Sequence, residues 1–384
     1  MNVFFSAGEA SGDAYAAALC HRLRDRLPGA SFLGIGASRS EAAGIRLVAN
    51  SARWGAMGIV EAVRVSPRVQ GGFRRTLREL SRETPGLFVP IDFGFLNIRL
   101  ARHAHRLGWR VVYFVPPGSW RRTKQGADLP QITDAIVTPF SWSADMLNDR
   151  GATARWFGHP IRELAGNAPR AEVPGRIAVL PGSRTHEAYR NLVPVAEAVR
   201  LINEAADSSP GSPVIREVEI AAAPGLAIET LQRAWQQLCP RVPAELTVGD
   251  VYGVLRRARA AVVCSGTATL EAAVCGCPMV VIYRASWLME LEFKIRRPKF
   301  DYISLPNILL QRGLLPELIQ HDASPERIAL HLSELLREGS DDRLAQLAGF
   351  EDLDRVLGPS DALDRAADWM VEIATATRSH GPNS

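Results

Sequence analysis

Residues 4–16 read FFSAGEASGDAYA, and this stretch indicates how the first half of the chain folds. A short apolar strand ends at Ala7, a turn with two glycines follows, and a helical pattern begins at once. Glycines allow the backbone N–H groups of such a turn to face a ligand, and Glu9 would add a carboxylate. Alternatively, Ser11 or Asp13 caps the helix. The stretch therefore predicts a βα unit whose turn either binds a ligand or caps a helix.

The same alternation of strand and helix continues through the chain in two series. The β-rich runs cover residues 2–6, 31–36, 87–92, 110–115 and 135–140, and then 176–182, 217–223, 245–249, 260–266 and 278–283. Repeated βα units predict parallel sheets, and 384 residues exceed the usual size of a single core. We therefore expect an α/β fold with two doubly wound, Rossmann-like domains at 1–165 and 166–355. A C-terminal helix within 356–384 is expected to cross back to the first domain and to end in a disordered tail.

Bulk composition excludes several classes of protein. The formal net charge is only +4, which argues against a general nucleic-acid binder. The five cysteines lie in apolar settings and form neither a disulfide framework nor a zinc pattern. No run approaches the roughly 20 apolar residues of a membrane span, and the sequence does not begin with a basic leader. These features predict a cytoplasmic protein.

Asp92 is a candidate general base. It follows the apolar run LFVPI and opens the segment DFGFLN. Partial burial at the end of a strand would raise the pKa of its carboxyl group toward working pH. An aspartate after a strand also commonly caps a turn, and position alone favours neither interpretation. The triplet DFG does not indicate a kinase, because the VAIK lysine and the HRD sequence are both missing.

Two turns in the second half of the chain have the form of phosphate-binding sites. Each follows a strand and precedes a helix, in VLPGSRTHE (179–187) and CSGTATLE (264–271). Their candidate donor-binding residues are Gly182, Ser183, Arg184, Ser265, Gly266 and Thr267. Glu271 could accept both hydroxyl groups of a ribose. Together the two turns suggest a nucleotide diphosphate leaving group, although two ordinary capped turns would share this pattern. A P-loop lysine is absent, which disfavours ATP hydrolysis.

Two segments combine apolar residues with arginine and lysine, as lipid-facing surfaces do. These are residues 54–80 and 287–300, the second reading WLMELEFKIRRPKF. Such a composition suits an interface with anionic headgroups or a lipid phosphate. Amphipathic helices that simply pack on a sheet have the same composition.

Taken together, the motifs resemble the lipid-A-disaccharide synthase family of inverting glycosyltransferases, which have the two-domain GT-B fold. The resemblance runs in order through SAGEASGD, AMGIVEAV, IDFGFLN, YFVPPGSW, WFGHPI, LPGSRTHE, SGTATLEAAVCGCPMVVIYR and DYISLPNILL, between residues 6 and 310. Each motif is modest alone, but eight in the family's order are highly specific.

The resemblance implies transfer of a diacylglucosamine from its UDP donor to the 6-hydroxyl of a diacylglucosamine 1-phosphate, which yields a β-1,6 disaccharide and UDP. It implies that Asp92 is the base and that Arg184 and Asn307 bind the donor. The residues that it assigns to the cleft and the acceptor are Glu9, Ser11, Gly12, Asp13 and Asn97. It implies no metal and no cofactor, since helix N-termini and Arg184 would carry the diphosphate charge. Peripheral association with the inner face of the cytoplasmic membrane follows from the lipid substrates, and family members can pair into homodimers.

The sequence also departs from the family pattern, mainly in the acceptor half. A second carboxylate expected after Asp92 is missing from residues 94–96, and 116–120 read PPGSW. The nature of the UDP-sugar donor is therefore better indicated than that of the acceptor. Two alternatives stay open: another GT-B enzyme, such as a UDP-sugar 2-epimerase or a transferase for a different lipid, and a non-catalytic descendant that binds nucleotide sugar.

Overall fold

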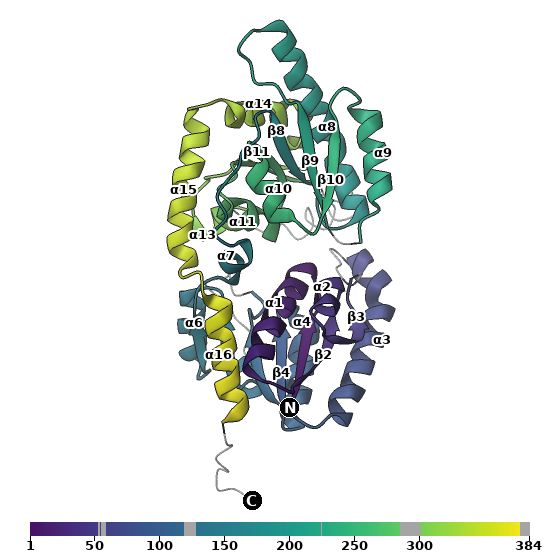
Figure 1. The fold of residues 1–384 in the computed structure, drawn as a ribbon, viewed down its shortest axis with the longest axis vertical. Helices are drawn as coiled ribbons and strands as arrows, with labels where there is room; N and C mark the ends of the chain where they lie inside the picture. Colours follow the sequence, from purple (N-terminus) through teal and green to yellow (C-terminus); the bar gives the residue numbers. More distant parts are fainter. Residues whose placement is uncertain (53, 55–58, 119–127, 224, 285–300, 377–384) are drawn as a thin grey trace, which may run out of the picture. The chain divides into compact units, whose positions relative to one another are not determined.

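The computed structural model describes residues 1–52, 54, 59–118, 128–223, 225–284 and 301–376. The chain forms two compact units (Figure 1). The first contains residues 1–164 together with the chain from residue 357 onward, and the second contains residues 165–356. The lysine- and arginine-rich segment 287–300 and the expected disordered tail beyond 376 lie outside the described residues.

The first unit is built on a seven-stranded parallel sheet in the order β3-β2-β1-β4-β5-β6-β7. Its strands are β1 (Asn2–Ala7), β2 (Ser31–Gly36), β3 (Arg46–Asn50), β4 (Leu87–Ile91), β5 (Arg110–Phe114), β6 (Ala135–Thr138) and β7 (Ala154–Trp156). Both faces of the sheet are buried, and successive side chains alternate between them. Val3 and Phe5 enter one apolar core, whereas Phe4 enters the other.

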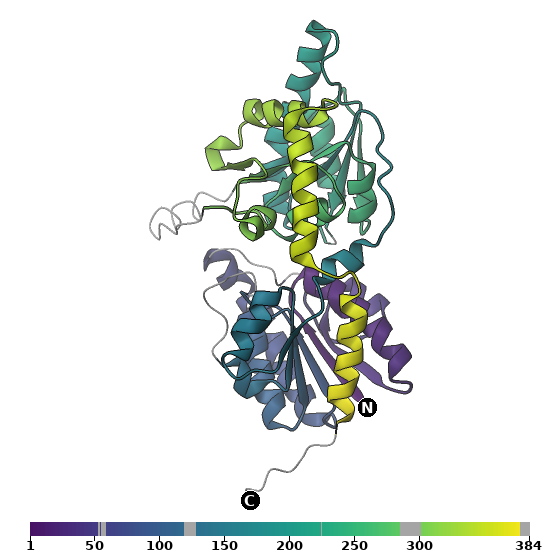
Figure 2. The same cartoon turned by 90° about the vertical axis from the view of Figure 1, so that its left-hand side faces the viewer.

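Helices cover both faces of this sheet. They are α1 (Ala10–Arg26), α2 (Ser38–Ala42), α3 (Ile59–Arg82), α4 (Gly94–Arg106), α5 (Leu129–Ile132), α6 (Ser141–Asn148), α7 (Pro160–Ala165) and α16 (Ala362–Thr375). The last of these belongs to the first unit although it comes from the end of the chain. It lies beside α1 in both views (Figures 1 and 2), and its Arg26–Asp368 ion pair measures 2.6 Å. Leu363 and Met370 of α16 are fully buried in the core that contains Phe5.

The second unit repeats the plan with a six-stranded parallel sheet in the order β10-β9-β8-β11-β12-β13. Its strands are β8 (Arg176–Leu180), β9 (Glu217–Ala222), β10 (Ala244–Val248), β11 (Ala260–Cys264), β12 (Met279–Tyr283) and β13 (Glu317–Ile319). Its helices are α8 (Thr185–Ser208), α9 (Ile228–Leu238), α10 (Val251–Arg257), α11 (Thr267–Val274), α13 (Leu305–Leu310), η1 (Gln320–Asp322), α14 (Pro325–Leu336) and α15 (Asp341–Leu357).

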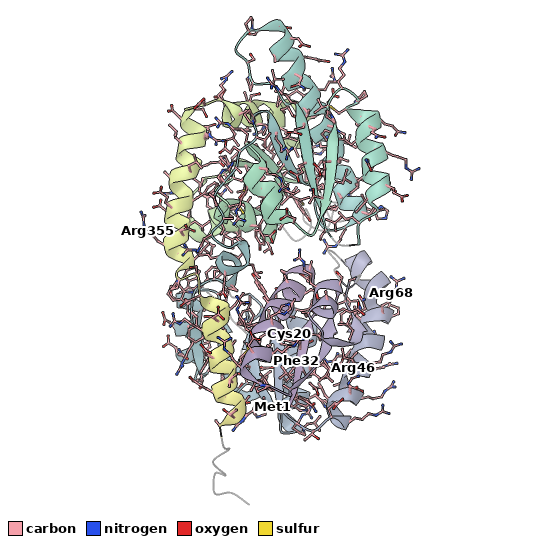
Figure 3. All side chains as sticks on the ribbon, viewed as in Figure 1. Met1, Cys20, Phe32, Arg46, Arg68 and Arg355 are labelled. Carbon is pink, nitrogen blue, oxygen red and sulfur yellow. The ribbon has the colours of Figure 1, made fainter. Side chains whose placement is uncertain are left out.

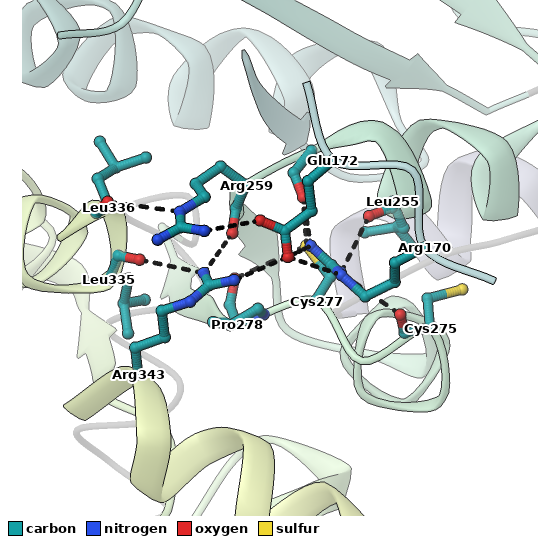
Figure 4. Close-up of polar contacts among 11 residues, drawn as sticks. Arg170, Glu172, Leu255, Arg259, Cys275, Cys277, Pro278, Leu335, Leu336 and Arg343 are labelled. Atoms are coloured by element: carbon teal, nitrogen blue, oxygen red, sulfur yellow. Dashed lines mark hydrogen bonds and ion pairs between the residues drawn. The ribbon is translucent and has the colours of Figure 1, made fainter. Parts of the chain in front are cut away.

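A cluster of three arginines around one glutamate fixes the amino-terminal side of this second sheet (Figure 4). The Glu172 carboxylate accepts from Arg170 Nε at 3.1 Å, Arg259 Nη1 at 3.0 Å and Arg343 Nη2 at 2.8 Å. Arg343 also donates to the carbonyl of Arg259 at 2.7 Å. The cluster ties the segment before β8, the residue before β11 and helix α15 together. It lies at the opposite edge from the turns that follow these strands.

The doubly wound α/β architecture is confirmed, and ten of its strands coincide with the expected β-rich runs. The sequence did not indicate β3, β7 or β13, which are short strands outside those runs. All five cysteines are buried free thiols, one in the first unit and four in the second. Cys20 is labelled in Figure 3.

Candidate active site

Each sheet has one point where the strand order reverses. In the first unit β1 pairs with β4, with Ala7 opposite Ile91. In the second unit β8 pairs with β11, with Leu180 opposite Val263. Loops on either side of such a reversal run in opposite directions, and they leave a crevice at the carboxyl ends of the strands where ligands bind. The sequence-predicted turns follow these four strands, so the fold places each pair of them at a reversal point.

Asp92 lies at the reversal point of the first unit, directly after β4. Burial and the nearby negative charge of Glu9 raise the pKa of its carboxyl group to about 6, from an ordinary 3.8. A hydrogen bond from the backbone N–H of Phe93 acts in the opposite direction but is the weaker influence. Glu9 itself is exposed and stands at the start of α1. A carboxyl group that ionises near pH 6 is suited to accept a proton at neutral pH.

Asn97 does not face a ligand, contrary to its expected place on the acceptor side. Its side chain is fully buried at 0% exposure. Nδ2 donates to the carbonyls of Ser6 at 3.0 Å, Ile91 at 2.9 Å and Asp92 at 2.9 Å, while Oδ1 accepts from Ser6 Oγ at 2.6 Å. The amide therefore joins the ends of β1 and β4, and it acts on the site through the backbone of Asp92.

Asp13 is also engaged within the protein. It is only 3% exposed, and its carboxylate accepts from the backbone N–H groups of Ala37 at 2.6 Å, Arg39 at 3.1 Å and Ser40 at 3.1 Å. Asp13 thus caps α2, the helix after the next strand, whereas Glu9, the N-cap residue of α1, makes no side-chain capping hydrogen bond. Gly12 is buried and Ser11 is half-buried. Of the residues expected to face a ligand in this loop, Glu9 and Ser11 are the accessible ones.

The PGSR turn lies at the reversal point of the second unit, between β8 and α8. Gly182 has φ +119°, and a Cβ there would lie 2.6 Å from Glu187 Oε2, so this position requires glycine. Ser183 is exposed and Arg184 is half-buried immediately before α8. The Arg184 guanidinium stands 3.8 Å from the Glu187 carboxylate, which is itself buried. This places a cation, a helix N-terminus and an open turn together.

The SGT turn lies beside it, between β11 and α11. Gly266 has φ +143°, and a Cβ there would meet nothing within 4 Å, so the turn is open on that side. Ser265 Oγ donates to the carbonyl of Ile303 at 2.9 Å and so fastens the turn to the segment before α13. Thr267 begins α11, and Glu271 Oε1 accepts from the Tyr252 hydroxyl at 3.4 Å.

The side chain of Asn307 has no hydrogen-bonding capacity left for the donor that it was expected to bind. Its Nδ2 donates to the Leu315 carbonyl at 3.0 Å and to Glu317 Oε1 at 2.9 Å, and its Oδ1 accepts from Leu314 N and Leu315 N at 2.9 Å each. These four bonds use the full capacity of an amide. The side chain instead holds α13 and the loop after it in place.

Neither unit offers a constellation for a resident metal within the part of the chain that the structure describes. No three histidine, cysteine, aspartate or glutamate side chains gather there as a cation would require. Among the described helices, none combines the length and the apolar character needed to cross a membrane. The chemical groups on hand are a partly buried carboxyl group in one unit and, in the other, an arginine with two helix N-termini.

The lipid-A-disaccharide synthetase family model matches residues 3–361, which include both reversal points. The chain belongs to this family. A relative from Acidobacterium capsulatum, a lipid-A-disaccharide synthase, is 33% identical over 349 residues that cover 87% of this chain and 86% of the relative. Another from Anaeromyxobacter dehalogenans (strain 2CP-C), with the same name, is 33% identical over 388 residues that cover 97% of each chain. The chain is therefore a glycosyltransferase of the lipid-A-disaccharide synthase family, as the motifs predicted.

Solved structures of more distant proteins agree with the GT-B fold. MurG from Acinetobacter baumannii superposes with a TM-score of 0.55 at 12% identity, covering 97% of this chain and 99% of that chain. A co-structure of S. aureus MnaA with UDP gives a TM-score of 0.62 at 10% identity, covering 98% of this chain and 99% of that chain. A putative UDP-N-acetylglucosamine 2-epimerase from Listeria monocytogenes gives 0.60 at 14%, covering 97% and 96%. Identities this low support the fold and carry no argument for epimerase activity.

Sequence reasoning missed the residues that support the two sites. Glu187 packs under Gly182, and Glu317 accepts from the backbone N–H groups of Ile303 at 2.8 Å and Ser304 at 2.9 Å. Tyr113 donates its hydroxyl to the carbonyl of Asp92 at 2.8 Å. Nothing in the sequence indicated a supporting role for these three, although Glu187 is the last residue of the motif VLPGSRTHE. Only their tertiary partners identify them.

Proposed function

We propose that this glycosyltransferase uses UDP-diacylglucosamine as donor and the 6-hydroxyl of diacylglucosamine 1-phosphate as acceptor. The observation that carries the proposal is the position of Asp92. Its partly buried carboxyl group lies where the strand order of the first sheet reverses, and the pKa of this group is raised to about 6. Membership of the family supports the choice of substrates.

In the proposed reaction Asp92 accepts the proton of the acceptor hydroxyl. The acceptor oxygen forms a new bond to the anomeric carbon of the donor sugar while the bond from that carbon to the diphosphate oxygen breaks. The electron pair of the broken bond leaves with UDP, and the attack from the opposite side gives the β-linkage. Asp92 has to be ionised at the start, so activity should rise as pH passes through about 6.

On the donor side, Arg184 and the N-termini of α8 and α11 would neutralise the diphosphate as negative charge develops on it. Glu271 would accept from the ribose hydroxyls. We assign these contacts to Gly182, Ser183, Arg184, Gly266, Thr267 and Glu271. Asn307 and Ser265 are assigned a positioning role instead, because their polar groups already bind within the protein.

We further infer that the enzyme works at the inner face of the cytoplasmic membrane, since both proposed substrates carry acyl chains. The outer face of α3 supports this placement. Its exposed side chains include the arginines at positions 68, 74, 75, 78 and 82, and Figure 3 labels Arg68 on this helix. Anionic headgroups attract such a cationic helix.

The direct test is product analysis. Purified protein incubated with the two proposed substrates should yield the β-1,6-linked disaccharide and UDP by mass spectrometry. Formation of an epimerised UDP-sugar without lipid acceptor, or no conversion with any lipid phosphate, would contradict the proposal.

Two variants separate the proposed roles. Asp92→Asn should abolish turnover while the affinity for UDP, measured by calorimetry, stays within about twofold. Arg184→Ala should weaken UDP binding by roughly tenfold or more, because a charge-assisted hydrogen bond is lost. Matched controls are Asp145→Asn on α6 and Arg200→Ala near the far end of α8, which are both exposed and should change neither quantity. Turnover by Asp92→Asn would remove Asp92 from the mechanism.

A further inference from the structure

The backbone around Asp92 is strained at three residues of the site. Asp92 has φ 43° and Phe93 has φ 46°, so two successive residues other than glycine occupy the left-handed region. On the neighbouring strand, Val115 follows β5 with φ 51°, which is unfavourable for a β-branched side chain. Backbone strain of this kind persists only where surrounding interactions impose it, and it is concentrated at functional sites.

Hydrogen bonds to strand β5 and helix α4 impose this conformation. The N–H of Asp92 donates to the carbonyl of Phe114 on β5 at 3.1 Å. The carbonyl of Asp92 accepts from the Tyr113 hydroxyl at 2.8 Å and from Asn97 Nδ2 at 2.9 Å. Both main-chain groups of Asp92 are thus engaged within the protein, so its carboxyl group is the part of the residue that can act on a substrate.

Tyr113 is built into the sheet as a rigid support. Its ring is 0% exposed and belongs to the apolar core that also contains Phe4 and Trp109. Burial, and secondarily the charge of Asp92, raise the pKa of its hydroxyl well above the ordinary range. The hydroxyl therefore keeps its proton at any working pH, and it remains a donor to the Asp92 carbonyl.

Asn97 is fixed from behind by Ser6. Ser6 Oγ donates to Asn97 Oδ1 at 2.6 Å, so the amide orientation is set and Nδ2 must point to the carbonyls of Ser6, Ile91 and Asp92. Ser6 and Asn97 are both fully buried. The contact extends the support of Asp92 to the carboxyl end of β1, the strand on the other side of the reversal point.

We propose that Tyr113, together with Asn97 and Ser6, forms a positioning device that holds the Asp92 backbone in its left-handed conformation and so aims the catalytic carboxyl group. This inference rests on the proposed role of Asp92 as the base. Tyr113 and Asn97 touch neither substrate in the proposal, and they act only through the main chain of Asp92.

The test is Tyr113→Phe in the full-length enzyme, because this change keeps the ring and removes the hydroxyl alone. We expect kcat to fall about tenfold, the value for loss of one buried hydrogen bond, with KM for the donor unchanged. Released from its support, the Asp92 carboxyl group should become better hydrated. The acidic limb of the pH profile should then move from about pH 6 toward the usual range of an aspartate. The titratable groups that face Asp92 here are Glu9 and Tyr113.

Trp109→Phe is the matched control. Trp109 precedes the same strand and is equally buried, and its Nε1 donates to the carbonyl of Leu80 at 3.1 Å, at the end of β5 away from Asp92. The Trp109→Phe variant should have a lower melting temperature and an unchanged pH profile. Ser6→Ala provides a second probe if Tyr113→Phe folds poorly, with an expected two- to threefold loss of kcat.

The outcomes distinguish the inference from the proposed function. Absence of product from the wild-type enzyme, or full activity in Asp92→Asn, would refute the proposed function. An active wild-type enzyme with an inactive Asp92→Asn variant, but with Tyr113→Phe and Ser6→Ala unchanged in kcat and in pH profile, would refute the positioning device alone.

Discussion

At the scale of single residues, Asp92 holds its carboxyl group in surroundings that disfavour its charge. Burial is the larger cause of its raised pKa, and the charge of Glu9 adds to it. The same residue also adopts a left-handed backbone. Both features lower the stability of the folded protein, and both are useful in a proton acceptor that must work near neutral pH.

A test of stability against pH follows from this. The pKa of Asp92 is about 6 in the folded protein and about 3.8 when unfolded, so the unfolded chain releases its proton first as pH rises. Stability is then lost between about pH 4 and pH 6, by up to about 3 kcal/mol at pH 8. Asp92→Asn should recover about 2 to 3 kcal/mol at pH 8 in denaturant unfolding, and clearly less at pH 5.

The exposed Asp145→Asn variant serves as the control in these unfolding measurements, and it should be neutral at both pH values. An Asp92→Asn variant that is equally or less stable than the wild type at pH 8 would show that the carboxyl group is better solvated than its burial implies.

At the scale of elements, α3 has one face in the core and the other in solvent. Thr76 and Leu80 are buried against the sheet, and Phe73 packs beside them under the Arg99 guanidinium, 4.7 Å from the ring centroid. The opposite face carries the exposed arginines, while Glu79 forms an ion pair with Arg46 at 2.9 Å. Packing thus accounts for the apolar half of the helix, whereas the exposed arginines at 68, 74, 75, 78 and 82 form no ion pair with any residue that the structure describes.

The triple variant Arg74→Gln, Arg75→Gln, Arg78→Gln tests that charge. Near an anionic surface each arginine is worth about 1 kcal/mol, so binding to vesicles that contain anionic lipid should fall roughly 100-fold in a sedimentation assay at low salt. Salt should weaken the binding of the wild type in the same assay. The control neutralises Arg200, Arg216 and Arg233 of the second unit. Equal loss in both triple variants would mean that net charge, and not this face, matters.

The strands at the two reversal points could be predicted because each is an apolar run with glycine or aspartate within two residues of its end. The short strand β13 could not, since Glu317–Ile319 has no such pattern. The roles of Asn97 and Asn307 were also out of reach. A polar side chain in a loop motif can bind a ligand or its own chain, and the partners that decide this, such as Ser6 for Asn97, lie 91 residues away. The left-handed conformation of Asp92 and Phe93 could not be predicted either, because neither residue is glycine.

At the scale of the whole molecule, the chain builds two units with separate cores, and the first is completed by the last helix. Met370 of α16 is fully buried in the core of the first unit, beside residues from the opposite end of the sequence such as Val3 and Leu19. The first unit therefore cannot close its core until the end of the chain is available.

Met370→Ala should lower the stability of the first unit by about 2 to 5 kcal/mol, because it leaves a cavity in that core. In calorimetry we expect one unfolding transition to move to lower temperature, while the transition that UDP raises stays in place. Leu330→Ala on α14, at a site that is 62% exposed, is the control and should move neither. A shift of both transitions in Met370→Ala would mean that the two units unfold as one.

The buried cysteines allow the opening of each unit to be detected by chemical labelling. Burial raises the pKa of every thiol, so the folded protein should resist alkylating reagents at neutral pH. Because Cys20 alone belongs to the first unit, a chain that acquires a single label has opened only that unit, and one that acquires four labels has opened only the second. The number of labels on each chain, measured as an increase in mass, therefore reports which unit has opened, without any engineered cysteine.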